Sequence, residues 1–141
     1  MKKVQSALVA AILAIALLSS CSSSSVGGAT ELLGTLGKLG VSPDQAIGGL
    51  GSIMSLAQGK LNPADFTKVS KSIPGLDNVM KQATDLGAIT GPLTSMAWVE
   101  QSFSKLGMNK DMVGKFVPEI TKFATQNGGA EVGNLLSGVL K

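Results

Sequence analysis

The fold is decided by a helix start signal and the apolar stripe behind it, Ser42-Pro43-Asp44-Gln45-Ala46-Ile47-Gly48-Gly49-Leu50-Gly51-Ser52-Ile53-Met54-Ser55-Leu56-Ala57. Ser42 is a preferred N-cap residue, Pro43 suits the first helical position, and Gln45 stands at capping-box spacing. Behind them, apolar residues recur at intervals of three and four, the period of one helix face: Ile47, Leu50, Met54 and Ala57. The stretch therefore predicts a helix that starts at Pro43 and ends near Gly59.

The same spacing recurs along the rest of the chain, and alternation at period two is absent. Asn62-Pro63-Ala64-Asp65 repeats the start signal, and Pro74-Gly75 ends the helix that follows. Near the C-terminus, Asn127-Gly128-Gly129 is predicted to separate two helices, and Pro118 to kink the longer one. Other apolar stripes begin at Leu32, Leu76, Met96, Val113 and Val132. The sequence predicts an all-α fold of six to seven short helices.

Two parts of the chain resemble each other, at about 39–73 and 106–140. When Leu39-Gly40 is aligned with Leu106-Gly107, three further identical pairs fall into register: Asp44 with Asp111, Ile53 with Ile120, and Ala57 with Ala124. We call this register the repeat offset. An offset shorter by one position aligns Ala64-Asp65-Phe66 with Ala130-Glu131-Val132. This internal repeat predicts two similar αα-hairpins, joined by a central helix pair between Leu76 and Leu106.

The segment 1–20 differs in character from the rest of the chain. Lys2 and Lys3 precede an apolar run from Ala7 to Leu18, and Ser19-Ser20-Cys21 follows it. A positive start, a short apolar middle and small residues before a cut site are typical of an export signal. The run is also shorter than the ~20 residues that a membrane-spanning helix needs. We therefore predict that residues 1–20 are a signal peptide, cleaved between Ser20 and Cys21.

Leu18-Ser19-Ser20-Cys21 resembles the lipobox of bacterial lipoproteins, in which a leucine and two small residues precede the lipid-bearing cysteine. The resemblance implies a diacylglyceryl group on the sulfur of Cys21 and an acyl chain, such as palmitate, on its new amino group. Several acyl chains on one residue suffice for stable anchoring. By the same resemblance, Ser22 in place of an aspartate favours the periplasmic face of the outer membrane. Residues 21–29 are rich in Ser and Gly and are predicted to tether a single domain at 30–141.

Composition narrows the classes of function. Loss of Lys2 and Lys3 with the signal leaves 10 basic residues against 9 acidic ones. The remaining lysines are dispersed and the chain has no Arg, which disfavours nucleic acid as a partner. Cys21 is the only cysteine, so no disulfide is expected. With four Phe, one Trp and no Tyr, the core of this domain must be mainly aliphatic.

The inventory of reactive side chains is thin. The chain has no His, which removes Ser-His-Asp and Cys-His systems and most zinc sites. Ser102-Phe103-Ser104-Lys105 has the Ser-x-x-Lys spacing of penicillin-binding enzymes but lacks their companion motifs. Four acidic residues fall in first turns of predicted helices, where they interact favourably with the helix dipole: Asp44, Asp65, Asp111 and Glu131. Three others have no such explanation: Asp77, Asp85 and Glu100. We predict no catalytic residue, metal site or cofactor, and no enzymatic activity.

Some residue types allow both a structural and a binding role. Gly48-Gly49-Leu50-Gly51 lies inside a predicted helix without a preceding strand, which favours close helix approach over a phosphate loop. Five methionines suit gaps in a core or an adaptable groove: Met54, Met80, Met96, Met108 and Met112. Trp98 lies off the stripe of its own helix, at about 100° per residue. It either packs on a neighbouring helix or is an exposed contact for a partner or for lipid headgroups.

The body of the chain also resembles VcgC/VcgE-type domains, a bacterial family without a defined activity. The likeness rests on several short segments: Leu39-Gly40-Val41-Ser42, Gly48-Gly49-Leu50-Gly51, Leu56-Ala57-Gln58-Gly59, Ile73-Pro74-Gly75-Leu76, residues 103–108, and Lys115-Phe116-Val117-Pro118. It implies an all-helical domain and brings no catalytic or ligand residues. We expect a lipid-anchored module that binds an envelope protein or other envelope component. The alternative is a carrier of lipids or small apolar ligands, held in a cavity between the hairpins.

Overall fold

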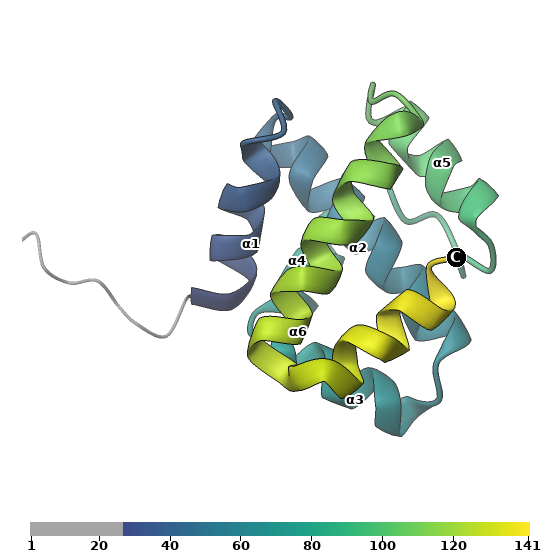
Figure 1. The fold of residues 1–141 in the computed structure, drawn as a ribbon. Coiled ribbons are helices and arrows are strands. Elements are labelled where there is room, and N and C mark those ends of the chain that lie inside the picture. Colours follow the sequence, from purple (N-terminus) through teal and green to yellow (C-terminus); the bar gives the residue numbers. More distant parts are fainter. Residues whose placement is uncertain (1–26) are drawn as a thin grey trace, which may run out of the picture.

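The computed structural model describes residues 27–141, which form six α-helices and no strand (Figure 1). The helices are α1 Gly27–Gly37, α2 Pro43–Lys60, α3 Pro63–Ser72, α4 Leu76–Asp85, α5 Met96–Lys105 and α6 Asp111–Val139. The prediction of an all-α fold is therefore confirmed for this part of the chain. None of these six helices has the length and apolar character needed to span a membrane.

Helix α2 is the centre of the fold. Its capping box forms as predicted, because the Gln45 N–H donates to Ser42 Oγ and the Ser42 N–H donates to Gln45 Oε1, at 3.2 and 2.9 Å. Every residue from Gly48 to Ala57 is buried, since α1, α4, α5 and α6 all pack against this helix. The segment from Leu76 to Leu106, predicted to supply a central pair, forms α4 and α5, and each of them packs on α2.

Three glycines allow these helices to approach α2 closely. A Cβ atom on Gly49 would lie 2.6 Å from Cε1 of Phe116, and one on Gly48 would lie 2.5 Å from Cδ1 of Leu106. A Cβ on Gly51 would overlap the Cβ of Ala83 in α4. Carbon atoms in favourable contact are about 3.5–4.0 Å apart, so a methyl group at any of the three positions would force its neighbour to shift. At Gly48 that neighbour is the end of a flexible leucine side chain, whereas at Gly51 it is a Cβ atom fixed to the backbone. The glycines have the close-packing role that the sequence predicts.

Aromatic and sulfur-containing side chains complete a mainly aliphatic core. Phe103 of α5 and Phe116 of α6 are fully buried and meet edge to face, with ring centroids 5.0 Å apart. Met54 and Met108 are buried, and three further methionines are half-buried against the same core: Met80, Met96 and Met112. All five methionines therefore pack in the core or against it.

Helix α6 is broken at one residue. Gly129 has φ 84° and ψ 173°, while the rest of the helix, including Pro118, keeps helical backbone angles. The predicted stop at 127–129 is thus present, but the predicted kink at Pro118 is not seen in these angles. The carbonyl group that lacks a donor because of Pro118 belongs to Gly114, which is exposed and can be hydrated by water.

The N-terminal boundary of the domain also differs from the prediction. Helix α1 begins at Gly27, so residues 27–29, assigned to the tether, belong to the folded domain. The Ala29 N–H donates to the Pro74 carbonyl at 2.8 Å, and the Ala29 side chain is buried. Gly28 lies so close to Pro74 that a Cβ atom would clash with the ring. The predicted signal peptide, the cleavage point at Ser20 and the lipid site at Cys21 lie outside the described residues.

Buried positions recur along the whole domain at the repeat offset, the register that aligns Leu39 with Leu106. The buried pairs are Leu32 and Val99, Leu36 and Phe103, Ala46 and Val113, Ile53 and Ile120, Leu56 and Phe123, Ala57 and Ala124, Val69 and Leu136, and Ile73 and Leu140. Gly40 and Gly107 are paired by the same offset, and both have positive φ, 85° and 76°. Asn62, the N-cap of α3, corresponds to Gly129. Hence α1, α2 and α3 correspond to α5 and the two parts of α6.

This constant offset corrects the shorter one used for the second half of the repeat. The shorter offset would pair the fully buried Val69 with Leu135, which is only half-buried. Leu136 is fully buried and packs where α6 crosses α3, as Val69 does on the other helix. Burial follows the position of a residue in the packed helices, whereas the similarity of Asp65 and Glu131, neither of which is buried in the core, does not fix the alignment.

Candidate partner-binding site

The candidate site is built on α5. Val99 and Phe103 point into the core and are fully buried, whereas Trp98, one residue before Val99, is 51% exposed. Successive side chains on a helix are about 100° apart, so Trp98 is turned away from the buried stripe. Of the two alternatives predicted for this residue, the structure favours exposure: about half of the indole is open to solvent, so it is not buried against a neighbouring helix.

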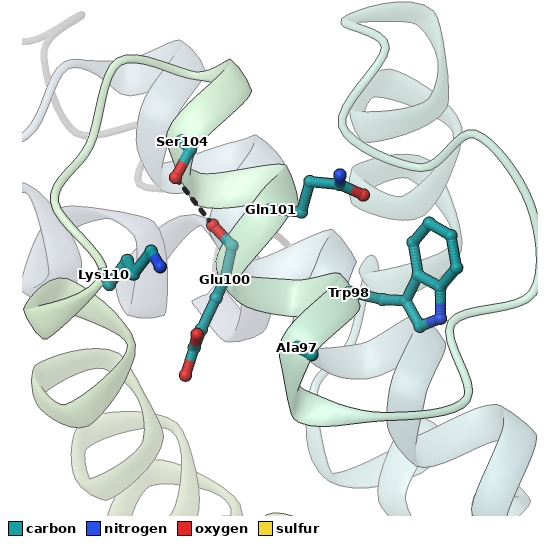
Figure 2. Close-up of a pocket in the computed structure, with 6 residues that line it drawn as sticks. All are labelled: Ala97, Trp98, Glu100, Gln101, Ser104 and Lys110. Atoms are coloured by element: carbon teal, nitrogen blue, oxygen red, sulfur yellow. Dashed lines mark hydrogen bonds between the residues drawn. The ribbon is translucent and has the colours of Figure 1, made fainter.

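Trp98 borders a groove of about 430 Å³. Ala97, Glu100, Gln101 and Ser104 line it from α5, and Lys110 lines it from the residue before α6. Figure 2 shows the indole of Trp98 and the carboxylate of Glu100 on opposite sides of α5, with Lys110 on the side of Glu100. The Ser104 hydroxyl donates to the Glu100 carbonyl at 3.1 Å, which fixes its orientation.

The groove continues onto α6. A second hollow of about 460 Å³ shares Glu100 and Lys110 with the first. Its walls are mainly apolar, and Met96, Val113, Val117, Pro118 and Leu140 contribute to them. The two adjoining hollows therefore form one surface. It carries an exposed indole at one end, the charged side chains of Glu100, Lys110 and Asp111 in the middle, and apolar side chains beyond them.

These groups suit recognition of a protein surface. Tryptophan offers a large apolar face and one N–H donor, and it is enriched among residues that dominate binding energy at interfaces. Glu100 and Lys110 provide one negative and one positive charge, which can orient a partner of mixed charge. The sequence predicts Trp98 as a candidate contact residue. The other α5 residues that line the groove, at 97, 100, 101 and 104, share one face by helical spacing, so the sequence could have indicated them as well. Lys110 and the α6 wall depend on how the two helices pack.

The structure places the other candidate residues apart from this groove or explains them locally. Asp44, Asp65, Asp77 and Asp111 lie in the first turns of their helices. Within residues 27–141 no group of three acidic side chains comes together, so Asp77, Asp85 and Glu100 do not converge. In the Ser-x-x-Lys segment, the Ser102 hydroxyl is buried and donates to the Trp98 carbonyl at 3.0 Å, while Lys105 is exposed.

One ion pair joins the two corresponding hairpins. Lys68 of α3 pairs with Glu131, just after the break in α6, and lies 3.7 Å from Asp65. The hydrogen bond and the charge of Glu131 together raise the pKa of Lys68 above its ordinary value of 10.5. Because both side chains are largely exposed, the pair aligns the hairpins and adds little to stability.

The space between the hairpins bears on the alternative of an apolar-ligand carrier. Where the two hairpins meet, the space is filled: residues 48–57 of α2, in the first hairpin, are all buried, and Gly49 packs against the rings of Phe103 and Phe116. Five hollows on the described residues are open to the surface, and they lie on α1 with the start of α2, on α3, on α5 and on α6. Close packing at the centre counts against a carrier that holds its ligand between the hairpins.

Comparison with known proteins identifies a family but no activity. Residues 14–141 match the family described as "Protein of unknown function VcgC/VcgE (DUF2780)", and the match includes Leu18 to Cys21. Neither a curated protein nor a solved structure matches the chain. Because the match covers most of the chain, this protein belongs to the VcgC/VcgE family of unknown function.

Proposed function

We propose that this protein is a lipid-anchored module of the bacterial cell envelope that binds a protein partner through the groove at Trp98. The anchor is Cys21, and the location is the periplasmic face of the outer membrane. Anchoring is supported by the lipobox-like segment Leu18-Ser19-Ser20-Cys21, which follows a signal-like apolar run. No catalytic step is part of the proposal, in keeping with a chain that has no His.

Binding is supported by one observation above the others, the 51% exposure of the single tryptophan beside a groove. Tryptophan is enriched at interfaces, because its large ring gains much from burial against a partner and its N–H can find a hydrogen-bond acceptor there. Glu100 and Lys110 line the same groove from the other side of α5, and their charges favour a protein over a purely apolar ligand.

The anchor is tested by the Cys21→Ala variant. In cells fed a labelled fatty acid, the wild-type protein should incorporate label and sediment with membranes, and Cys21→Ala should do neither. Acylation of the variant, together with membrane association, would refute the anchoring proposal.

Partner binding is tested by a photo-crosslinking amino acid at position 98, read in living cells by mass spectrometry. Position 31 is a matched control, because Glu31 is exposed on α1 and corresponds to Trp98 at the repeat offset. A defined protein adduct from position 98, absent from position 31, is expected. Adducts to lipid alone at position 98 would contradict the proposal and favour a lipid carrier.

A further inference from the structure

Each half of the repeat carries a groove at the corresponding place, but the side chains that line the two grooves differ. A hollow of about 280 Å³ on the first half is lined by Leu33, Gly34, Gly37, Val41, Pro43 and Ile47. Four of these correspond, at the repeat offset, to lining residues of the Trp98 groove: Leu33 to Glu100, Gly34 to Gln101, Gly37 to Ser104, and Pro43 to Lys110. Both hollows lie where the first helix of a half meets the start of the second.

The α1 groove, defined by these six residues, has no charged or polar side chain in its wall. Gly34, Gly37 and Pro43 are exposed, and the larger apolar residues beside them are half-buried. At the corresponding places the Trp98 groove has a carboxylate, an amide, a hydroxyl and an ammonium group. The α1 groove is therefore suited to an apolar environment, and the Trp98 groove to a polar one.

The chain before α1 limits how the domain can sit at a membrane. Helix α1 begins at Gly27, six residues after Cys21. Six residues span at most about 20 Å when fully extended. Their point of attachment is fixed on the domain, because the Ala29 N–H donates to the Pro74 carbonyl at 2.8 Å and Gly28 packs on the same proline. A lipid on Cys21 would hold this end of α1 within about 20 Å of the bilayer surface.

The same limit acts against one orientation of the domain. A domain of this length has a radius of gyration of about 13 Å and is roughly 35 Å across. Figure 1 shows α1 and α5 on opposite sides of α2. With the α5 side against the bilayer, Gly27 on the α1 side would stand up to about 35 Å from the surface, whereas six residues span about 20 Å. With the α1 side against the bilayer, Gly27 is within that span.

We propose that the α1 groove lies against the bilayer surface and so turns the Trp98 groove away from the membrane, toward its partner. This inference rests on the proposed acylation of Cys21. The tether keeps the α1 groove at a high effective concentration near the bilayer, so that a small apolar contact suffices. The outward groove remains accessible because its charged residues do not enter the apolar part of the membrane.

The test uses the acylated full-length protein, reconstituted in vesicles of phosphatidylethanolamine and phosphatidylglycerol, with a fluorophore on one introduced cysteine. The sulfur of an acylated Cys21 is blocked, so the new thiol is the one that reacts. Gly34→Cys reports on the α1 groove, and Gln101→Cys is the matched position on the other groove. Nothing lies within 4 Å of a Cβ atom on Gly34, so the substitution fits the fold.

A nitroxide quencher attached to the lipids should quench the label at position 34 several-fold more strongly than the label at position 101. A second pair of variants tests the chemistry of the groove. Gly37→Glu should abolish the difference in quenching between positions 34 and 101, because it places a carboxylate in the α1 groove, whereas Ser104→Glu should leave that difference unchanged. Circular dichroism shows that each variant is folded, and the intact mass shows separately whether Cys21 carries lipid.

Equal quenching at the two positions, or stronger quenching at 101, in protein whose mass proves acylation would overturn the orientation and leave the anchor intact. A label at 34 that the lipids do not quench, but that envelope proteins shield from a soluble quencher, would assign the α1 groove to a protein and likewise overturn the inference. Protein without lipid by mass would instead refute the proposed function.

Discussion

The contact between α2 and α4 provides the sharpest test of how this fold is packed. In Gly51→Ala, the new methyl group would overlap the Cβ of Ala83. Neither Cβ atom can move by rotation of a side chain, so the backbones of α2 and α4 must separate by more than 1 Å to reach a normal contact of about 3.5 Å. Overpacking of this kind costs typically about 1–3 kcal/mol.

Helix propensity acts in the opposite direction. Alanine is more favourable than glycine in a helix interior by about 0.8–1.0 kcal/mol. The net expectation for Gly51→Ala is a loss of about 1–2 kcal/mol in the free energy of unfolding. Gly114→Ala is the matched control, because Gly114 is exposed in α6 and a Cβ there has no neighbour within 4 Å. That variant should gain up to about 1 kcal/mol.

Urea denaturation, followed by circular dichroism on the domain from residue 27, measures both values. Ala83→Gly removes the atom that the new methyl group overlaps, so it should cost less stability in the Gly51→Ala background than alone. The coupling from the double-mutant cycle should reach about 1–2 kcal/mol. If Gly51→Ala is as stable as Gly114→Ala, or if Ala83→Gly gives no rescue, the close approach of α2 and α4 is not what requires glycine.

Two further predictions concern the caps and the charges. Ser42→Ala removes the acceptor for the Gln45 N–H and should lower stability by about 1 kcal/mol, whereas Ser95→Ala, at an N-cap without a side-chain hydrogen bond, should change it little in the same denaturation assay. Lys68→Met should reduce stability slightly at neutral pH and low salt. Because Glu131 raises the pKa of Lys68 in the folded state, the contribution is fully present below the ordinary pKa of 10.5 and disappears as the pH rises through the raised value. The control is Lys71→Met, which removes a nearby lysine outside this pair and should show no such dependence on salt. A difference between wild type and Lys68→Met that persists at high salt would contradict an electrostatic origin.

Local features of this fold could be predicted from the sequence, and features that depend on distant contacts could not. The capping box at Ser42 and the stop near Gly129 act over a few residues, and both are present. The helical state of residues 27–29 depends on Pro74, far away in the chain, so a stretch rich in glycine is mistaken for tether. The burial of all sides of α2 depends in the same way on four other helices.

The candidate site shows the same division. The exposure of Trp98 follows from its angle relative to Val99 and Phe103, which the period of the helix predicts. The rest of the groove does not follow from α5 alone. Lys110 and the apolar wall at Val117 and Pro118 reach the site only because α6 passes beside α5. A local pattern can thus identify a binding side chain, while the shape around it is a property of packing.

The contact between Gly49 and Phe116 explains why the two halves of the repeat cannot be identical. These residues correspond at the repeat offset, and they also touch, since a Cβ on Gly49 would lie 2.6 Å from the Phe116 ring. Two phenylalanines at this place would overpack the core, and two glycines would leave a cavity. Efficient packing therefore requires a small residue in one half and a large one in the other. Because the halves must differ at their contact, they cannot exchange places in the fold. Each groove therefore always belongs to the same half, and the side chains that line the two grooves can differ as well.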